Sequence, residues 1–398
     1  MAEDRPRGYL RDREDEDSAR ASFVELFFDL VFVFAVIQLA AFMVEHLSPE
    51  GIVQGGILLL ALWWFWINTT WATNRLDPDR GLVRAVIFAL MAAALMFSVS
   101  ITGAFGDRGL VFAGAYVLMQ VGRSAFMVWV LAVHGEEAQR ETFRRVAVWF
   151  AISGLFWIGG AFAEGDLRIV LWATALLIEF AVPWTGFRLP GLGQSSTGAW
   201  DVEGEHLTER CALFIILALG ESILVTGGRM VELEWDAATL AAFGVAFLSL
   251  ITMWWIYFDS GARRGIKAFE RSEEPGRLAR FAYTYVHLPI VAGVVVVAVG
   301  DKLLLAHPED HLDTMTALVI LSGPALFLLG NLLFKNATGR RWPLSHLIGL
   351  ALLLVPVPWL DALSLIALSG WTVAVMIAVA ILERALLRSR EAARVGVN

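Results

Sequence analysis

The sequence has 398 residues, of which 58% are hydrophobic and only 18% are charged, and its mean hydropathy is +0.64. A soluble domain carries about 25% charged residues, so this composition excludes an ordinary soluble globular protein. The net charge of −8 comes without a dense run of lysine or arginine, which argues against a nucleic-acid partner. The single cysteine, Cys211, excludes an intramolecular disulfide.

A polar N-terminal segment precedes a series of apolar stretches long enough to cross the hydrocarbon core of a bilayer. Residues 1–21 have mixed charge and lack the apolar stretch of a signal peptide, so we expect a mobile cytoplasmic tail. The pattern predicts an all-α polytopic membrane protein with about twelve transmembrane helices. The predicted spans are 22–44, 51–72, 82–103, 109–133, 143–163, 167–187, 207–229, 235–258, 278–300, 314–335, 341–360 and 363–385.

The connections between these spans alternate in charge. The tail, the even-numbered connections and the C-terminus hold 25 of the 31 lysines and arginines, the odd-numbered connections hold 4, and Arg123 and Arg210 lie within spans. Basic connections stay in the cytoplasm, so both termini are predicted to be cytoplasmic. The lipid bilayer is therefore the main expected partner.

Two halves of the chain, 22–187 and 207–385, carry similar features in the same order. The end of span 2 (63–68) and the end of span 8 (254–259) are both rich in tryptophan, and arginine pairs precede spans 5 and 11. Because each half has six spans, we predict two parallel six-helix repeats. A cytoplasmic linker, 188–206, joins them, and residues 386–398 form a second cytoplasmic tail.

Span 1 contains two acidic residues on one helix face. Glu25 and Asp29 are four residues apart, which places them roughly 5 and 10 Å inside the cytoplasmic boundary. Two like charges at this spacing repel, so one should hold a proton or a cation should lie between them. An ionisable residue inside a span is a functional candidate, and a structural ion pair is the alternative.

Other spans carry ionisable residues as well. Glu221 lies past the midplane of span 7, between Gly220 and Ser222, and is the strongest single candidate. Arg123, near the centre of span 4, needs an acidic partner, for which Glu221, Asp29 and Glu179 are the possibilities. Glu209 and Arg210 either reach interfacial water or pair with the acids of span 1. The predicted ion or substrate pathway therefore comprises Glu25, Asp29, Arg123, Glu179, Glu209, Arg210, Glu221, Asp259 and His287.

Soluble-type catalytic motifs do not stand out. The chain has no phosphate-binding glycine loop and no His/Cys set at metal-binding spacing, and no nucleophile–base pair emerges. We therefore expect neither enzymatic activity nor a cofactor or metal.

Three segments together resemble a known family. Residues 24–34, 209–223 and 254–259 are similar to signatures of the bacterial low temperature requirement protein A family. The resemblance implies a bacterial inner-membrane protein whose signature acids are Glu25, Asp29, Glu209 and Glu221. It does not define a molecular activity.

Three functions fit these features. A secondary transporter or exchanger would use the intramembrane acids to couple a proton or small cation to the movement of an ion or small solute. A cation channel would instead line its pore with spans 1 and 7. A non-transporting scaffold or sensor would hold the charges in closed structural pairs. We rank the transporter first, and the oligomeric state is open.

Overall fold

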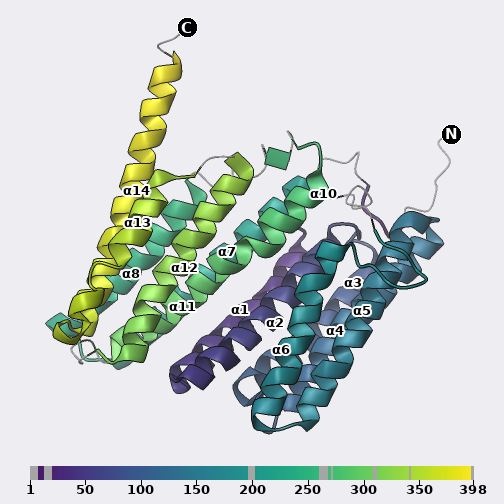
Figure 1. Ribbon diagram of the computed structural model, residues 1–398, viewed down its shortest axis with the longest axis horizontal. Coiled ribbons are helices and arrows are strands. Elements are labelled where there is room, and N and C mark those ends of the chain that lie inside the picture. Colours follow the sequence, from purple (N-terminus) through teal and green to yellow (C-terminus); the bar gives the residue numbers. More distant parts are fainter. Residues whose placement is uncertain are drawn as a thin grey trace. The chain divides into compact units, whose positions relative to one another are not determined.

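The computed structural model describes residues 8–12, 20–195, 202–259, 268–269, 272–306, 308, 312–339 and 342–395. These residues form a series of α-helices joined by short connections (Figure 1). Within the described part of the chain, eleven helices are long and apolar enough to cross a membrane. The prediction of an all-α polytopic membrane protein is therefore confirmed.

Contacts divide the chain into two units. The first comprises Met1–Phe42, Pro49–Arg210 and Ser272–Ala279, and the second comprises Met43–Ser48, Cys211–Arg271 and Arg280–Asn398. The predicted parallel relation between two six-helix halves stays a prediction.

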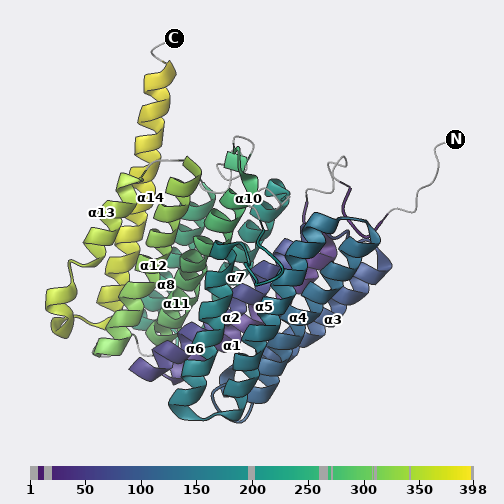
Figure 2. The same ribbon diagram turned by 45° about the vertical axis from the view of Figure 1, so that its right-hand side comes forward.

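The first unit is built mainly from α1 to α6. Its elements are α1 (Phe23–Glu45), α2 (Pro49–Thr73), α3 (Gly81–Ser100), η2 (Ile101–Gly103), α4 (Gly109–Val133), α5 (Glu137–Phe162), α6 (Gly165–Ala181), η3 (Val182–Thr185) and the first turns of α7 (Gly204–Glu232). Helix α4 packs against α2, α3 and α5, and α6 packs against α2 and α5; α3, α4 and α5 lie side by side in Figures 1 and 2.

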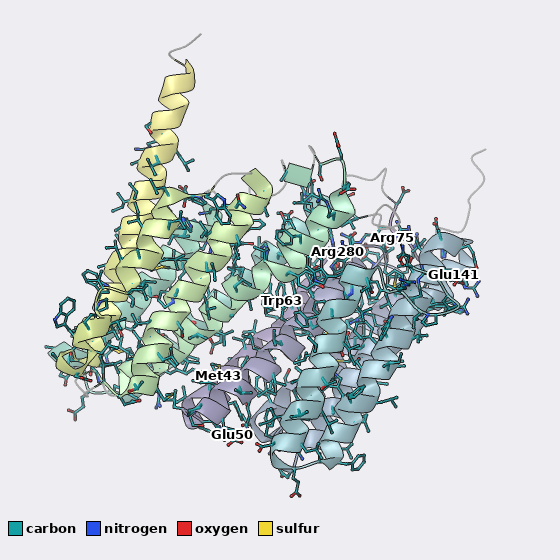
Figure 3. All side chains as sticks on the ribbon, viewed as in Figure 1. Met43, Glu50, Trp63, Arg75, Glu141 and Arg280 are labelled. Atoms are coloured by element: carbon teal, nitrogen blue, oxygen red, sulfur yellow. The ribbon has the colours of Figure 1, made fainter. Side chains whose placement is uncertain are left out.

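The connections of the first unit alternate between its two ends, as the predicted topology requires. Figure 3 labels Arg75 and Glu141 at one end of the helices and Glu50 at the other. Arg75 follows α2 and Glu141 lies near the start of α5, whereas Glu50 lies at the start of α2. Between the ends, the rings of Phe112, Trp157 and Trp172 pack against one another in tilted arrangements, with centroids 5.2–6.0 Å apart.

The second unit contains the rest of α7 and the helices that follow. Its elements are α8 (Ala237–Phe258), the π-helix η5 (Ala279–Tyr285), α11 (His287–Ala306), α12 (Thr314–Gly339), α13 (Leu344–Leu353), η6 (Val357–Ala362) and α14 (Leu365–Val395); the short α10 (Pro275–Leu278), which precedes η5, belongs to the first unit. A β-carbon on Gly293 of α11 would lie 2.5 Å from the backbone nitrogen of Phe327, and one on Gly330 of α12 would lie 2.6 Å from that of Ile290. Glycine therefore lets the backbones of α11 and α12 approach closely.

The predicted span 341–360 is a broken helix. Helix α13 has 10 residues, about 15 Å, which is too short to cross a hydrocarbon core of about 30 Å. Pro356 and Pro358 interrupt the helix. The chain continues as η6 to the start of α14. There the backbone nitrogen of Ile366 donates to the carbonyl of Pro308, which precedes α12. The segment thus still runs the length of α12.

The two predicted tails differ from expectation where the structure describes them. Residues 8–12 are anchored rather than mobile: the backbone nitrogen of Arg11 donates to the Arg75 carbonyl and that of Asp77 to the Tyr9 carbonyl, each at 2.9 Å. The rest of the N-terminal tail, 1–7 and 13–19, lies outside the described residues. At the other end α14 continues to Val395, ten residues beyond the predicted span (Figure 1), so most of the predicted C-terminal tail is helical.

Candidate functional site

Glu25 lies at the centre of a buried polar network in the first unit. Its side chain is 1% exposed and accepts from Arg11 Nη2 at 2.8 Å and from the backbone nitrogen and hydroxyl of Ser22 at 2.9 and 3.0 Å. Arg210 Nη1 and His206 Nε2 lie 2.8 and 3.0 Å from its other oxygen. Both oxygens are therefore fully engaged by groups of the chain.

Asp29 shares Arg210 with Glu25. Its Oδ1 accepts from Arg210 Nη2 at 2.7 Å and from the Trp66 indole at 2.8 Å, and its Oδ2 has no hydrogen-bond partner among the described residues. The cation expected between the two acids is thus the guanidinium of Arg210. With Arg11 added, two carboxylates face two guanidiniums, and the network is neutral.

Residues around this network attach loops to the helices. Asn74, after α2, donates to the Glu203 carbonyl at 2.8 Å and lies 3.1 Å from His206 Nδ1. Glu209 is only partly buried and accepts from the backbone nitrogen of Ala21 at 2.7 Å. These contacts secure the segments before α1 and α7.

Arg123 and Glu179 are joined by a relay of side chains between α4 and α6. Arg123 donates to Gln120 Oε1, Gln120 Nε2 donates to the Tyr116 hydroxyl at 3.1 Å, and Tyr116 donates to Glu179 Oε2 at 2.5 Å. Ser153 of α5 also donates to Glu179, at 2.7 Å. Three acids were considered as partners of Arg123. The structure links Arg123 to Glu179, through this relay and without a direct ion pair.

Glu221 lies in the second unit, beside two charged residues of α11. Its Oε1 is 3.5 Å from Lys302 Nζ, and its side chain is fully buried. Asp301 is 8% exposed, interacts electrostatically with Glu221, and has an Oδ2 without a hydrogen-bond partner among the described residues. Glu221 therefore has one basic partner, Lys302, and one acidic neighbour, Asp301, and Arg229 of α7 interacts electrostatically with Lys302.

Sequence reasoning missed Asp301 and Lys302 because the predicted span ended at residue 300. Helix α11 continues to Ala306. The apolar run Leu303-Leu304-Leu305-Ala306 after the charged pair is the signal that would have extended the span. Because apolar residues lie on both sides of the charged pair, the periodicity of those residues would have placed the pair inside the helix.

The remaining candidates do not join these clusters. His287 is buried, 2.9 Å from the Tyr257 hydroxyl and 2.8 Å from the Ala282 carbonyl, so both ring nitrogens are engaged. Asp259 is exposed at the C-terminal end of α8. No group of three or more His, Cys, Asp or Glu side chains arranged to hold a metal occurs in the described part of the chain.

A second buried ion pair of the second unit was also missed. Lys335 Nζ lies 2.7 Å from Glu383 of α14, 3.0 Å from the Ile256 carbonyl of α8 and 3.3 Å from His346 of α13. One ammonium therefore connects α12 with three neighbouring helices. The sequence prediction put Lys335 at the last residue of a span, where an interfacial position is expected.

Comparison with known proteins agrees with the resemblance noted in the sequence. The family model for bacterial low temperature requirement A protein (LtrA) matches residues 20–381. A protein of Rhizobium meliloti (strain 1021), named only as uncharacterized, is 39% identical over 376 residues, which cover 94% of this chain and 92% of that protein. No solved structure matches the chain. The matched range includes Glu25, Arg123 and Glu221, and the chain belongs to the bacterial low temperature requirement A family.

Proposed function

We propose that the chain is a secondary transporter of the bacterial inner membrane, and that Glu221 and Asp301 take up its coupling proton or monovalent cation. The observation that supports this proposal is the composition of the cluster in the second unit. Glu221 has Lys302 as its partner, but Asp301 makes no ion pair among the described residues and interacts electrostatically with Glu221, so one added positive charge at Asp301 relieves the repulsion between the two acids. Such unbalanced acids inside membrane helices are typical of ion pathways.

The acids of the first unit do not have this property. Glu25 and Asp29 are paired with Arg11 and Arg210, so they need no further cation. A channel that uses these two acids to attract cations would first have to break the ion pairs. The transporter is therefore the better proposal, and the positive-inside charge pattern supports cytoplasmic termini for it.

Ion flux in proteoliposomes tests this function. Proton, sodium and potassium gradients would be imposed in turn on wild type, Glu221→Gln and Asp301→Asn, with a pH-sensitive dye and an ionophore control. We expect flux with wild type and a fall to the level of empty liposomes with both variants, because each removes one negative charge from the cluster.

A matched control is Asp361→Asn, which neutralises an exposed acid of η6 in the same unit and should leave flux unchanged. All variants would be shown to be folded by thermal unfolding. Full flux in folded Glu221→Gln and Asp301→Asn would rule out these acids as the coupling site. Absence of flux in wild type under every gradient would favour a scaffold or sensor.

A further inference from the structure

Arg123 is a buried guanidinium that has only neutral partners. Its side chain, near the middle of α4, is 3% exposed. It donates to the Thr69 hydroxyl of α2 at 3.0 Å and to Gln120 Oε1, and lies 5.7 Å from the centre of the Phe150 ring. Among the described residues no carboxylate is within ion-pair distance of it, and a guanidinium has five N–H groups to satisfy.

Arg168, another buried arginine of the same unit, has a different environment. It donates to backbone carbonyls through all three of its nitrogens, among them those of Gly160, Ala104 and Gly106 at 2.9–3.1 Å. Those carbonyls lie at helix ends that need a donor, so Arg168 has a structural role. Arg123 has no such set of carbonyl acceptors, and its partners are the side chains of Thr69 and Gln120.

We infer that Arg123 binds a small anion, such as a carboxylate or an inorganic oxyanion, inside the first unit. A planar guanidinium binds such oxyanions through two parallel hydrogen bonds. The anion would take the place of the Gln120 oxygen on the guanidinium. We assign this anion as the solute that the proposed transporter moves. Only that assignment rests on the proposed function.

Glu179 is the internal counter-charge of this site. It accepts from Tyr116, from Ser153 at 2.7 Å and from the Trp157 indole at 3.0 Å, and no cation contacts it directly among the described residues. In the empty site, positive Arg123 and negative Glu179 balance. When an anion binds, the charge stays balanced if Glu179 takes up one proton from solvent, so one anion enters with one proton.

The relay explains how protonation of Glu179 affects the hydrogen bonds of Arg123. A protonated Glu179 donates to the Tyr116 oxygen, and the Tyr116 hydroxyl then turns to donate to Gln120. Gln120 must present its oxygen to Tyr116, and therefore withdraws it from Arg123. The guanidinium is released for the anion by a reversal of hydrogen-bond directions, with no movement of a helix.

Few other ionisable groups face this relay. Helix α5 presents Ser153 and Trp157 to Glu179, and α2 presents Thr69 to Arg123; none of these titrates. On α6 itself, Arg168 is eleven residues from Glu179, roughly 16 Å along the helix. Glu50 of α2 lies at the opposite end of that helix from Thr69. Tyr116 and Arg123 of α4 are therefore the groups that govern the proton on Glu179.

Calorimetric titration of the purified full-length protein tests the inference. Nitrate, acetate and phosphate would each be titrated in two buffers of different ionisation enthalpy, which gives the number of protons taken up with each anion. We expect at least one of the three to bind wild type with uptake of one proton, and its affinity to fall about tenfold per pH unit as the pH rises. Glu179→Gln, which resembles the protonated acid, should bind that anion without proton uptake and with no such slope.

Arg123→Gln should lose binding and Arg123→Lys should weaken it, while Arg84→Gln, at a half-exposed arginine, is the control that should bind as wild type. Unchanged binding in folded Arg123→Gln, a pH slope retained in Glu179→Gln, or no binding of any probe to wild type would each overturn the inference. Anion binding without gradient-driven flux would remove only the transport proposal. Flux without anion binding would remove only this site.

Discussion

Buried arginines of the first unit have three different kinds of partner. Arg210 forms ion pairs with Glu25 and Asp29 at 2.8 and 2.7 Å, whereas Arg168 uses carbonyls and Arg123 uses neutral side chains. Removing one partner from a buried ion pair leaves an uncompensated charge and is far more costly than removing both. The Arg210 cluster is therefore best examined by single and double substitutions.

Arg210→Met should destabilise the protein by about 3–5 kcal/mol, because Asp29 then has no basic partner and Glu25 loses one of its two arginines. The double variant Arg210→Met/Asp29→Asn should recover part of this loss, since one of the stranded charges is gone. Thermal unfolding in detergent measures both. Arg84→Met, which breaks an exposed pair with Asp79, should change stability by less than about 1 kcal/mol. Equal destabilisation by Arg210→Met and Arg84→Met would contradict a stabilising role for the network.

Some of these residues were found from the sequence and others were not, for a physical reason. Asp29 and Glu221 stand out because charge inside an apolar run is costly and therefore rare. Arg11 does not stand out, because hydropathy says nothing of a tertiary contact between a polar segment and a helix. Asp301 was missed because a charged pair was taken as the end of a span.

At the scale of elements, α11 and α12 form the closest helix pair of the second unit, with Gly293 and Gly330 at their contact. Gly293→Ala and Gly330→Ala should each destabilise the protein by about 1–3 kcal/mol, because the added methyl group meets the backbone of the facing helix. Gly244→Ala in α8, where nothing lies within 4 Å of the added carbon, should be neutral or slightly stabilising. Thermal unfolding of the three variants side by side checks this, and loss of stability in Gly244→Ala alone would be the opposite result.

Helices were predicted well where one apolar run forms one helix, and less well where prolines interrupt the run. Helix α1 was expected at 22–44 and lies at Phe23–Glu45. The prediction for 341–360 missed the break after α13, although Pro356 and Pro358 are visible in the sequence. The close contacts of α11 with α12 were not predictable, because glycine is common both in tight helix pairs and in flexible segments.

At the scale of the whole molecule, the distribution of basic residues predicts which connections face the cytoplasm. In a Cys211→Ser background, which removes the only cysteine, single cysteines would be placed at Asp79 and at Asp107, both exposed. A membrane-impermeant thiol reagent added to intact cells should label Asp107→Cys and not Asp79→Cys, and lysis should expose the second site. The reverse pattern would invert the proposed orientation.

The anchored residues 8–12 have a consequence for biogenesis. Arg11 leaves the ribosome early, but its partner His206 is 195 residues further along the chain, with Nη2 and Nε2 3.2 Å apart in the finished protein. At a synthesis rate of about 5–20 residues per second, that partner follows about 10–40 seconds later. During this interval α1 is already in the membrane without Arg210 to neutralise its acids. Asp29 therefore lacks its arginine until the start of α7 has been made, and an early stop in translation leaves a chain in which this buried acid is unpaired.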